Sequence, residues 1–235
     1  MTFIEELTEL VDEIARKQWE LREGRVVPES ENVGLGNVGV RLEATILCAD
    51  LADSTRLAMT NRTIASEVYK AFLVCSSKIM RLRAGEVRSF NGDRVMGVFI
   101  GSSRNTNAAK AALNINYAFL KILKPRFEEQ YEVLRDGTIG LAHCVGVDTG
   151  EVLVARGGIR NNNDLVWVGR APNIAAKLST RRNAPYFSYV TKAVYTGMSV
   201  EVKVHDGKDM WENRTWDERP EGVRDIYRSN WTWKP

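Results

Sequence analysis

The chain is poor in cysteine and has no long apolar run. Its 235 residues include three cysteines, Cys48, Cys75 and Cys144, with no CxxC pair, and each lies in an apolar run where a reduced thiol acts as a small hydrophobe. This pattern argues against a disulfide framework. No stretch approaches the roughly 18 apolar residues of a membrane span, and residues 1–24 lack the apolar core of a signal peptide. We therefore expect a reduced, cytoplasmic protein without a membrane partner.

The chain also lacks a large excess of charge of one sign. Its 33 basic and 30 acidic side chains leave a net charge of +3, so no long-range field would draw it onto nucleic acid. Hydrophobic residues make up 44% and charged residues 27%, which excludes disordered, collagen-like and coiled-coil classes. We expect a globular protein with one principal core that binds phosphate only locally.

Apolar spacing predicts an N-terminal helix followed by a connector. Apolar residues three and four apart over 3–22 predict one amphipathic helix, and the glycines and proline of residues 24–39 break helical structure. The sequence thus divides into residues 1–39, a helix with its connector, and residues 40–235, the main domain. Packing or dimerisation is the simplest role for the helix.

The main domain alternates strand and helix patterns in the order β-α-β-β-α-β. This order predicts an α+β fold with a ferredoxin-like core, a mainly antiparallel sheet with helices on one face. Asn91-Gly92 predicts a type I′ turn in the central hairpin. The expected strands and helices cover residues 41–50, 61–83, 86–90, 93–100, 108–123, 138–147, 152–156, 165–168 and 173–182.

Two carboxylates are expected at one edge of this sheet. Asp50 ends the first strand and Asp93 begins the second strand of the hairpin, and in the split fold these strands are antiparallel neighbours. Two such close carboxylates repel unless cations lie between them, and oxygen ligands suit Mg²⁺ or Mn²⁺. This arrangement is typical of a two-metal phosphoryl-transfer site. The alternative is structural: Asp50 or Asp53 caps the next turn and Asp93 suits the hairpin.

Two further segments contain candidate binding residues. Ala52, Asp53, Ser54 and Thr55 follow the first carboxylate at a helix entrance, where small side chains and free N–H groups favour a triphosphate. Asn173 and Lys177 lie four apart on one helical face, so an amide and a cation project together. The alternative for this pair is a solvated surface.

Taken together, these segments resemble the class III nucleotidyl cyclase catalytic domain. ILCADLADST at 46–55 looks like the first metal-binding segment of the family and FNGD at 90–93 like its second. VGRAPNIAAK at 168–177 is similar to the transition-state segment, and VGVDTGEV at 145–152 to the intervening strands. The resemblance covers about residues 43–179 in the same order and spacing.

The resemblance implies a mechanism and a set of residues for it. Asp50 and Asp93, with the backbone carbonyl of Leu51, would bind two divalent cations, Mn²⁺ or Mg²⁺, while the ribose 3′-hydroxyl attacks the α-phosphorus and pyrophosphate leaves. Asn173 would orient the ribose. Lys177 stands where the family usually has arginine and would neutralise charge in the transition state. Because family members build the site between two subunits, a head-to-tail homodimer is implied.

The resemblance to the family also suggests which nucleotide base the substrate carries. Ser89 and Val166 occupy the positions where adenylate cyclases carry a purine-reading Lys and an Asp or Thr. The short chain resembles the pyrimidine cyclases of bacterial Pycsar anti-phage defence, which make cyclic UMP or cyclic CMP for a separate effector protein. UTP is favoured over CTP, and the candidate base-reading residues are Arg88, Ser89, Arg94, Val166 and Trp167.

Other assignments remain open in the sequence. The chain could be a purine cyclase that reads its base with unfamiliar residues, or an inactive cyclase-like dimerisation module. Arg219, or alternatively Arg224, could contact the triphosphate. His143 is expected to be a satisfied core residue rather than a general base.

Overall fold

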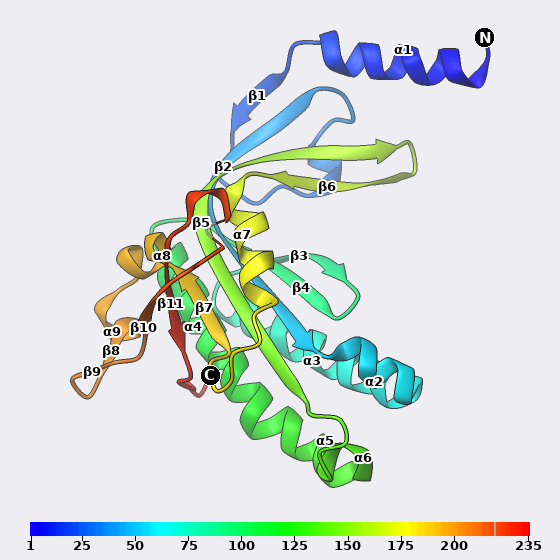
Figure 1. Cartoon of the computed structure of the whole chain (residues 1–235). Coiled ribbons are helices and arrows are strands. Elements are labelled where there is room, and N and C mark those ends of the chain that lie inside the picture. Colours follow the sequence, from blue (N-terminus) through cyan, green and yellow to red (C-terminus); the bar gives the residue numbers. More distant parts are fainter. Residues whose placement is uncertain (219) are drawn as a thin grey trace. The chain divides into compact units, whose positions relative to one another are not determined.

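The computed structural model describes residues 1–218 and 220–235 as two compact units (Figure 1). The first unit comprises Met1–Glu43 and Glu151–Gly169, and the second comprises Ala44–Gly150 and Arg170–Pro235. Two long strands, β2 (Val38–Ala52) and β5 (Ala142–Ile159), contribute residues to both units. Within the described residues, no helix is long and apolar enough to cross a membrane.

The first unit contains the N-terminal helix and two strand pairs. Helix α1 (Phe3–Arg16) begins with a capping box between Thr2 and Glu5 and buries none of its residues. Strand β1 (Glu20–Glu23) pairs in parallel with the start of β2, and β6 (Asn162–Val168) pairs antiparallel with the end of β5. A short 3₁₀ turn, η1, covers Ser30–Asn32.

The predicted single helix over residues 3–22 is wrong in its last part. The side-chain amide of Asn37 donates to the carbonyl oxygens of Ile14 and Lys17, at 2.8 and 2.7 Å, and so takes up acceptors at the end of α1. The following residues form strand β1 instead, because the backbone of β2 offers them a partner.

The second unit contains the predicted ferredoxin-like core. Its sheet runs in the order β10-β11-β7-β5-β2-β4-β3, so the four core strands β5, β2, β4 and β3 lie in the order expected of a β-α-β-β-α-β chain. The remaining elements are α2 (Ser54–Thr60), α3 (Arg62–Leu82), β3 (Glu86–Asn91), β4 (Arg94–Phe99), α4 (Arg104–Ala118), η2 (Phe119–Leu123), α5 (Lys124–Gln130), α6 (Glu132–Arg135), α7 (Arg170–Ser179), β7 (Ser188–Thr191), α8 (Lys192–Gly197), α9 (Val200–Lys203), β8 (Val204–His205), β9 (Lys208–Asp209), β10 (Glu212–Thr215), η3 (Pro220–Gly222) and β11 (Asp225–Ser229).

Helices α3 and α4 pack their buried residues into the main core on one face of the sheet. Asn61 caps α3 by accepting from the backbone N–H groups of Thr63 and Ile64, and the buried stripe of α3 includes Val68 and Phe72. Helix α4 buries five alanines, which allows close packing against its neighbours. This confirms the predicted placement of helices on the sheet.

Three predicted boundaries are wrong. The break expected between the strands at 138–147 and 152–156 is absent, because β5 runs through it as one strand and buries Asp148. In the β3–β4 hairpin Asn91 still pairs with Arg94, so the two-residue turn is Gly92-Asp93, and only Gly92 has positive φ, at 61°. Helix α7 ends at Ser179 rather than at residue 182.

Close packing of β5 against α7 depends on Gly146. A Cβ at this position would lie 2.2 Å from the carbonyl oxygen of Ala175 and 2.5 Å from the backbone nitrogen of Ser179. Both atoms belong to the helix backbone, so neither can rotate away. The helix that carries Asn173 and Lys177 can therefore pack this close to the sheet only because residue 146 has no side chain.

We predict that Gly146→Ala lowers the free energy of unfolding by about 2 kcal/mol or more, because α7 must shift to admit one methyl group. Urea denaturation followed by circular dichroism measures this change. Gly140→Ala is the matched control, since a Cβ at this exposed position meets no atom within 4 Å. Equal stabilities for the two variants would contradict the packing argument.

Candidate active site

The structure brings Asp50 and Asp93 to one cavity. Strands β2 and β4 pair antiparallel from Thr45 opposite Phe99 to Ala49 opposite Val95. Continuing this register by two residues places Asp50 opposite Arg94 and Leu51 opposite Asp93. Both carboxylates line a cavity of about 780 Å³ at this end of the strands. The antiparallel pairing expected from the element order therefore accounts for their proximity.

The cavity wall includes most of the segment expected to bind a triphosphate. Asp53, Ser54 and Thr55 line it, together with Arg56 from α2. Ala52 does not line this cavity, and instead lies beside a smaller one of about 190 Å³ next to His143. Asp53 adopts a left-handed conformation with φ of 54°, which turns the chain from β2 into α2. The expectation for Arg219 concerns a residue that lies outside the described ones.

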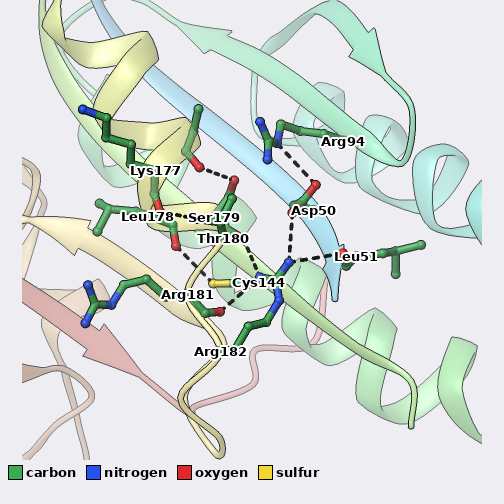
Figure 2. A network of polar contacts seen from close by, with 11 residues as sticks. Asp50, Leu51, Arg94, Cys144, Lys177, Leu178, Ser179, Thr180, Arg181 and Arg182 are labelled. Carbon is green, nitrogen blue, oxygen red and sulfur yellow. Dashed lines mark hydrogen bonds and ion pairs between the residues drawn. The ribbon is translucent and has the colours of Figure 1, made fainter. Parts of the chain in front are cut away.

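Two arginines contact the carboxylate of Asp50 (Figure 2). Arg94 Nε lies 3.3 Å from Oδ1, and Arg182 Nη2 lies 3.1 Å from Oδ2. The same Arg182 nitrogen donates to the carbonyl oxygen of Leu51 at 3.3 Å. The Asp50 side chain is only 8% exposed, so these contacts lie largely out of water. Sequence reasoning missed Arg182 because it extended the preceding helix through this residue.

The donor atoms fit a divalent cation. Asp93 Oδ2 is buried and has no hydrogen-bond partner among the residues that the structure describes, and a buried charged oxygen without a partner is costly. Asp93 and Asp50 with the Leu51 carbonyl offer only oxygen ligands, which suit Mg²⁺ or Mn²⁺. Among residues 1–218 and 220–235, no cluster of three or more His, Cys, Asp or Glu side chains is arranged to bind a metal. A divalent cation here would therefore rely on two carboxylates and a backbone carbonyl.

Asn173 and Lys177 project from the exposed face of α7. Both side chains are exposed, whereas Ile174, Ala175 and Leu178 on the opposite face are buried. Neither Asn173 nor Lys177 lines the cavity that contains Asp50. Figure 2 shows the Lys177 side chain directed away from Asp50. The structure thus separates this pair from the carboxylates of the same chain.

The candidate base-reading residues fall in different parts of the chain. Ser89 is half-buried in β3, opposite Met96 and beside a shift in strand register. Val166 and Trp167 belong to the first unit, where Val166 is 47% exposed. The indole Nε1 of Trp167 is buried without a hydrogen-bond partner in the described part of the chain. None of the three lines the cavity of Asp50.

Nearby titratable groups in the core are unsuited to proton transfer at neutral pH. His143 stacks near Phe119 and Phe187, with ring centroids 4.2 and 5.3 Å away, and burial lowers its pKa to about 3. Its core position is as expected, but the expected hydrogen bonds are absent, since neither ring nitrogen has a partner within the described residues. Burial likewise raises the pKa of Cys144 to about 12, so it remains a thiol.

Asp148 shows how the core stabilises a buried carboxyl group. It accepts hydrogen bonds from Thr191 Oγ1 at 2.6 Å and from Arg170 Nη2 at 3.4 Å. Burial raises the pKa of Asp148, and these two partners oppose the shift. It connects β5, β7 and the start of α7, which indicates a structural role.

Solved structures define the class of fold. An adenylyl cyclase, CyaB from P. aeruginosa, matches with a TM-score of 0.64 and 22% identity over 81% of this chain and 95% of that one. The guanylate cyclase domain of RhGC from Catenaria anguillulae matches with a TM-score of 0.59 and 15% identity over 82% and 99%. A class III adenylyl cyclase-like ATP-binding protein from Pseudomonas aeruginosa matches with a TM-score of 0.65, 16% identity and coverage of 86% and 45%. The fold is therefore that of a class III cyclase domain.

Sequence relatives then define the family. Proteins named uridylate cyclase match over their whole length: one from Rhodovulum sp. (strain MB263) is 38% identical over 100% of this chain and 99% of its own, and one from Xanthomonas perforans is 38% identical over 98% and 97%. No protein-family model matches the chain. The chain belongs to the family of these uridylate cyclases.

We predict that Mn²⁺ stabilises the protein against thermal unfolding and that Asp93→Asn abolishes this effect, because only the folded state brings Asp93 and Asp50 together. At a hundredfold excess over the dissociation constant, the gain is about 2.7 kcal/mol. Differential scanning calorimetry measures it. Asp53→Asn is the control, since Asp53 lines the same cavity and asparagine tolerates its left-handed backbone. Equal stabilisation of Asp93→Asn and the wild type would count against this cation site.

Proposed function

We propose that this protein is a uridylate cyclase, which converts UTP to 3′,5′-cyclic UMP and pyrophosphate. The observation that carries the proposal is the cavity shared by Asp50 and Asp93, in a chain 38% identical over its full length to proteins of that name. Both carboxylates, with the carbonyl of Leu51, would hold two divalent cations, Mn²⁺ or Mg²⁺. When bound, such cations lower the pKa of a hydroxyl and hold a triphosphate.

Residues of α2 would bind the triphosphate, and residues of α7 would act on the ribose and the α-phosphate. Ser54, Thr55 and Arg56 line the cavity and would bind the triphosphate. The ribose 3′-hydroxyl gives its proton to water and its oxygen attacks the α-phosphorus in line, while the bond from the α-phosphorus to the bridging oxygen breaks and pyrophosphate leaves. Asn173 orients the ribose. Lys177 neutralises the negative charge that grows on the α-phosphate, as a point charge without the paired donors of arginine.

A second copy of the chain would complete each site. Asn173 and Lys177 are exposed on α7 and do not line the cavity of their own chain. A head-to-tail homodimer would place this pair from one subunit against the carboxylates of the other, and its symmetry would create two equivalent sites. On this view residues 1–39 form an N-terminal appendage and residues 40–235 form the catalytic domain.

The proposed preference for a pyrimidine base rests on the side chains at the two positions that read a purine in adenylate cyclases. Ser89 is a short hydroxyl side chain and Val166 is apolar, so neither offers the cation and carboxylate expected of a purine site. Uracil presents one donor and two carbonyl acceptors, whereas cytosine presents an amino donor, so a single side chain could separate them. The names of the relatives favour UTP, and CTP is the second candidate.

The biological setting follows from the family resemblance. We infer a cytoplasmic enzyme whose cyclic nucleotide acts as a second messenger on a separate effector protein in anti-phage defence. The protein would need neither a nucleic acid nor a membrane partner.

We predict that the purified protein with Mn²⁺ forms cyclic UMP from UTP and little product from CTP, ATP or GTP. Mass spectrometry of the products from each nucleotide alone tests this. Asp50→Asn should remove at least about 99% of the activity, since one carboxylate contributes to holding both cations. Cyclic AMP or cyclic GMP as the main product would contradict the assignment of Ser89 and Val166, and binding without turnover would indicate an inactive module.

Mixing two inactive variants tests the shared site. Asp93→Asn and Lys177→Ala should each be nearly inactive as homodimers, but an equal mixture should recover up to about one quarter of the wild-type activity, because half of the dimers then carry one intact site. Activity is measured after subunit exchange. Mixing Asp93→Asn with Asp50→Asn is the control and should recover none. If the first mixture also recovers none although mixed dimers form, the carboxylates and Lys177 do not act across subunits.

A further inference from the structure

We propose that Arg182 is a cationic latch that competes with a divalent cation for Asp50 and for the carbonyl oxygen of Leu51. The proposal rests on the proposed cation site and adds a regulating residue to it. Its basis is a contact that no motif predicts: one arginine nitrogen, Nη2, contacts Asp50 Oδ2 at 3.1 Å and the Leu51 carbonyl at 3.3 Å (Figure 2). Two of the proposed cation ligands are thus engaged by a single nitrogen.

The other side of the same guanidinium is bound to the end of α7. Arg182 Nη1 donates to the carbonyl oxygens of Ser179 at 2.9 Å and Arg181 at 3.1 Å. Carbonyl groups at the end of a helix lack partners within it, and a cation is favourable there. Arg182 therefore links the carboxylate segment to the helix that carries Asn173 and Lys177.

The guanidinium and a divalent cation cannot use these acceptors together. A cation of the size of Mg²⁺ or Mn²⁺ must approach its oxygen ligands to about 2 Å, well inside the space next to Nη2. Two positive charges that close repel strongly, because the Asp50 side chain is 8% exposed and water screens them poorly. Cation binding therefore requires Arg182 to leave Asp50.

The latch can open without unfolding the site. The Arg182 side chain is 36% exposed, so it has a path to solvent, and it follows the end of α7 at Ser179 in a segment without regular secondary structure. Arg94 is less exposed, at 29%, and lies at the start of β4, a strand that pairs with β2. Of the two arginines, Arg182 is thus the one placed to move.

The test measures Mn²⁺ binding to the nucleotide-free protein, by the electron paramagnetic resonance signal of free Mn²⁺. Arg182→Gln should bind Mn²⁺ about tenfold more tightly than the wild type, because the competing charge is gone. Arg56→Gln is the matched control: it removes the same charge from the same cavity, but Arg56 Nη2 donates to the carbonyl oxygen of Thr138. Its affinity should change less than about twofold, as expected of an exposed charge.

The latch is wrong if Arg182→Gln and Arg56→Gln bind Mn²⁺ equally. Should Arg182→Gln fail to fold by circular dichroism, Arg182→Met replaces it, since methionine keeps an unbranched side chain without the charge; it should also bind Mn²⁺ more tightly, and wild-type affinity would overturn the proposal. Asp50→Asn reports separately on the cation site. If it leaves Mn²⁺ binding unchanged, the site itself, and with it the proposed two-cation mechanism, is refuted.

Discussion

The buried carboxylate of Asp50 imposes the main physical constraint on the second unit. It lies at the end of a strand whose residues 44–52 are all buried, and a charge in that position requires a compensating cation. The structure meets the requirement with two arginines from different elements, Arg94 on the paired strand and Arg182 beyond α7. Positive charge therefore already surrounds this carboxylate before any divalent cation binds.

The proposed site residues lie in two separate places on the chain. The carboxylates of Asp50 and Asp93 and the hydroxyls of residues 54 and 55 share one cavity, while Asn173 and Lys177 lie on the exposed face of a helix outside it. Gly146 holds that helix close to β5, and Arg182 ties its end to the carboxylate segment. Small changes in packing at β5 should therefore affect the orientation of α7.

The element order was sufficient to predict how Asp50 and Asp93 come together. A β-α-β-β-α-β chain places its first and third strands side by side, so two residues at facing ends of those strands must be close. The pairing of β2 with β4 confirms this placement. Spacing alone could not assign roles to the residues, and the family resemblance supplied them.

Features that depend on tertiary contacts were not predictable from the sequence. The break expected between the strands at 138–147 and 152–156 is a continuous strand because Thr191 and Arg170 provide partners for a buried Asp148. The hairpin turn shifts by one residue because Asn91 remains in the ladder. Arg182 was placed in a helix that ends three residues earlier, so no local pattern revealed its contact with Asp50.

The most direct test of this account is a crystal structure with Mn²⁺ and a non-cyclisable UTP analogue, with data collected at the manganese absorption edge. The account predicts two manganese peaks about 2 Å from oxygens of Asp50 and Asp93, with Arg182 withdrawn from Asp50 and with Asn173 and Lys177 of the other subunit beside the nucleotide. Manganese bound elsewhere, or Arg182 still on Asp50 with nucleotide in the cavity, would contradict it.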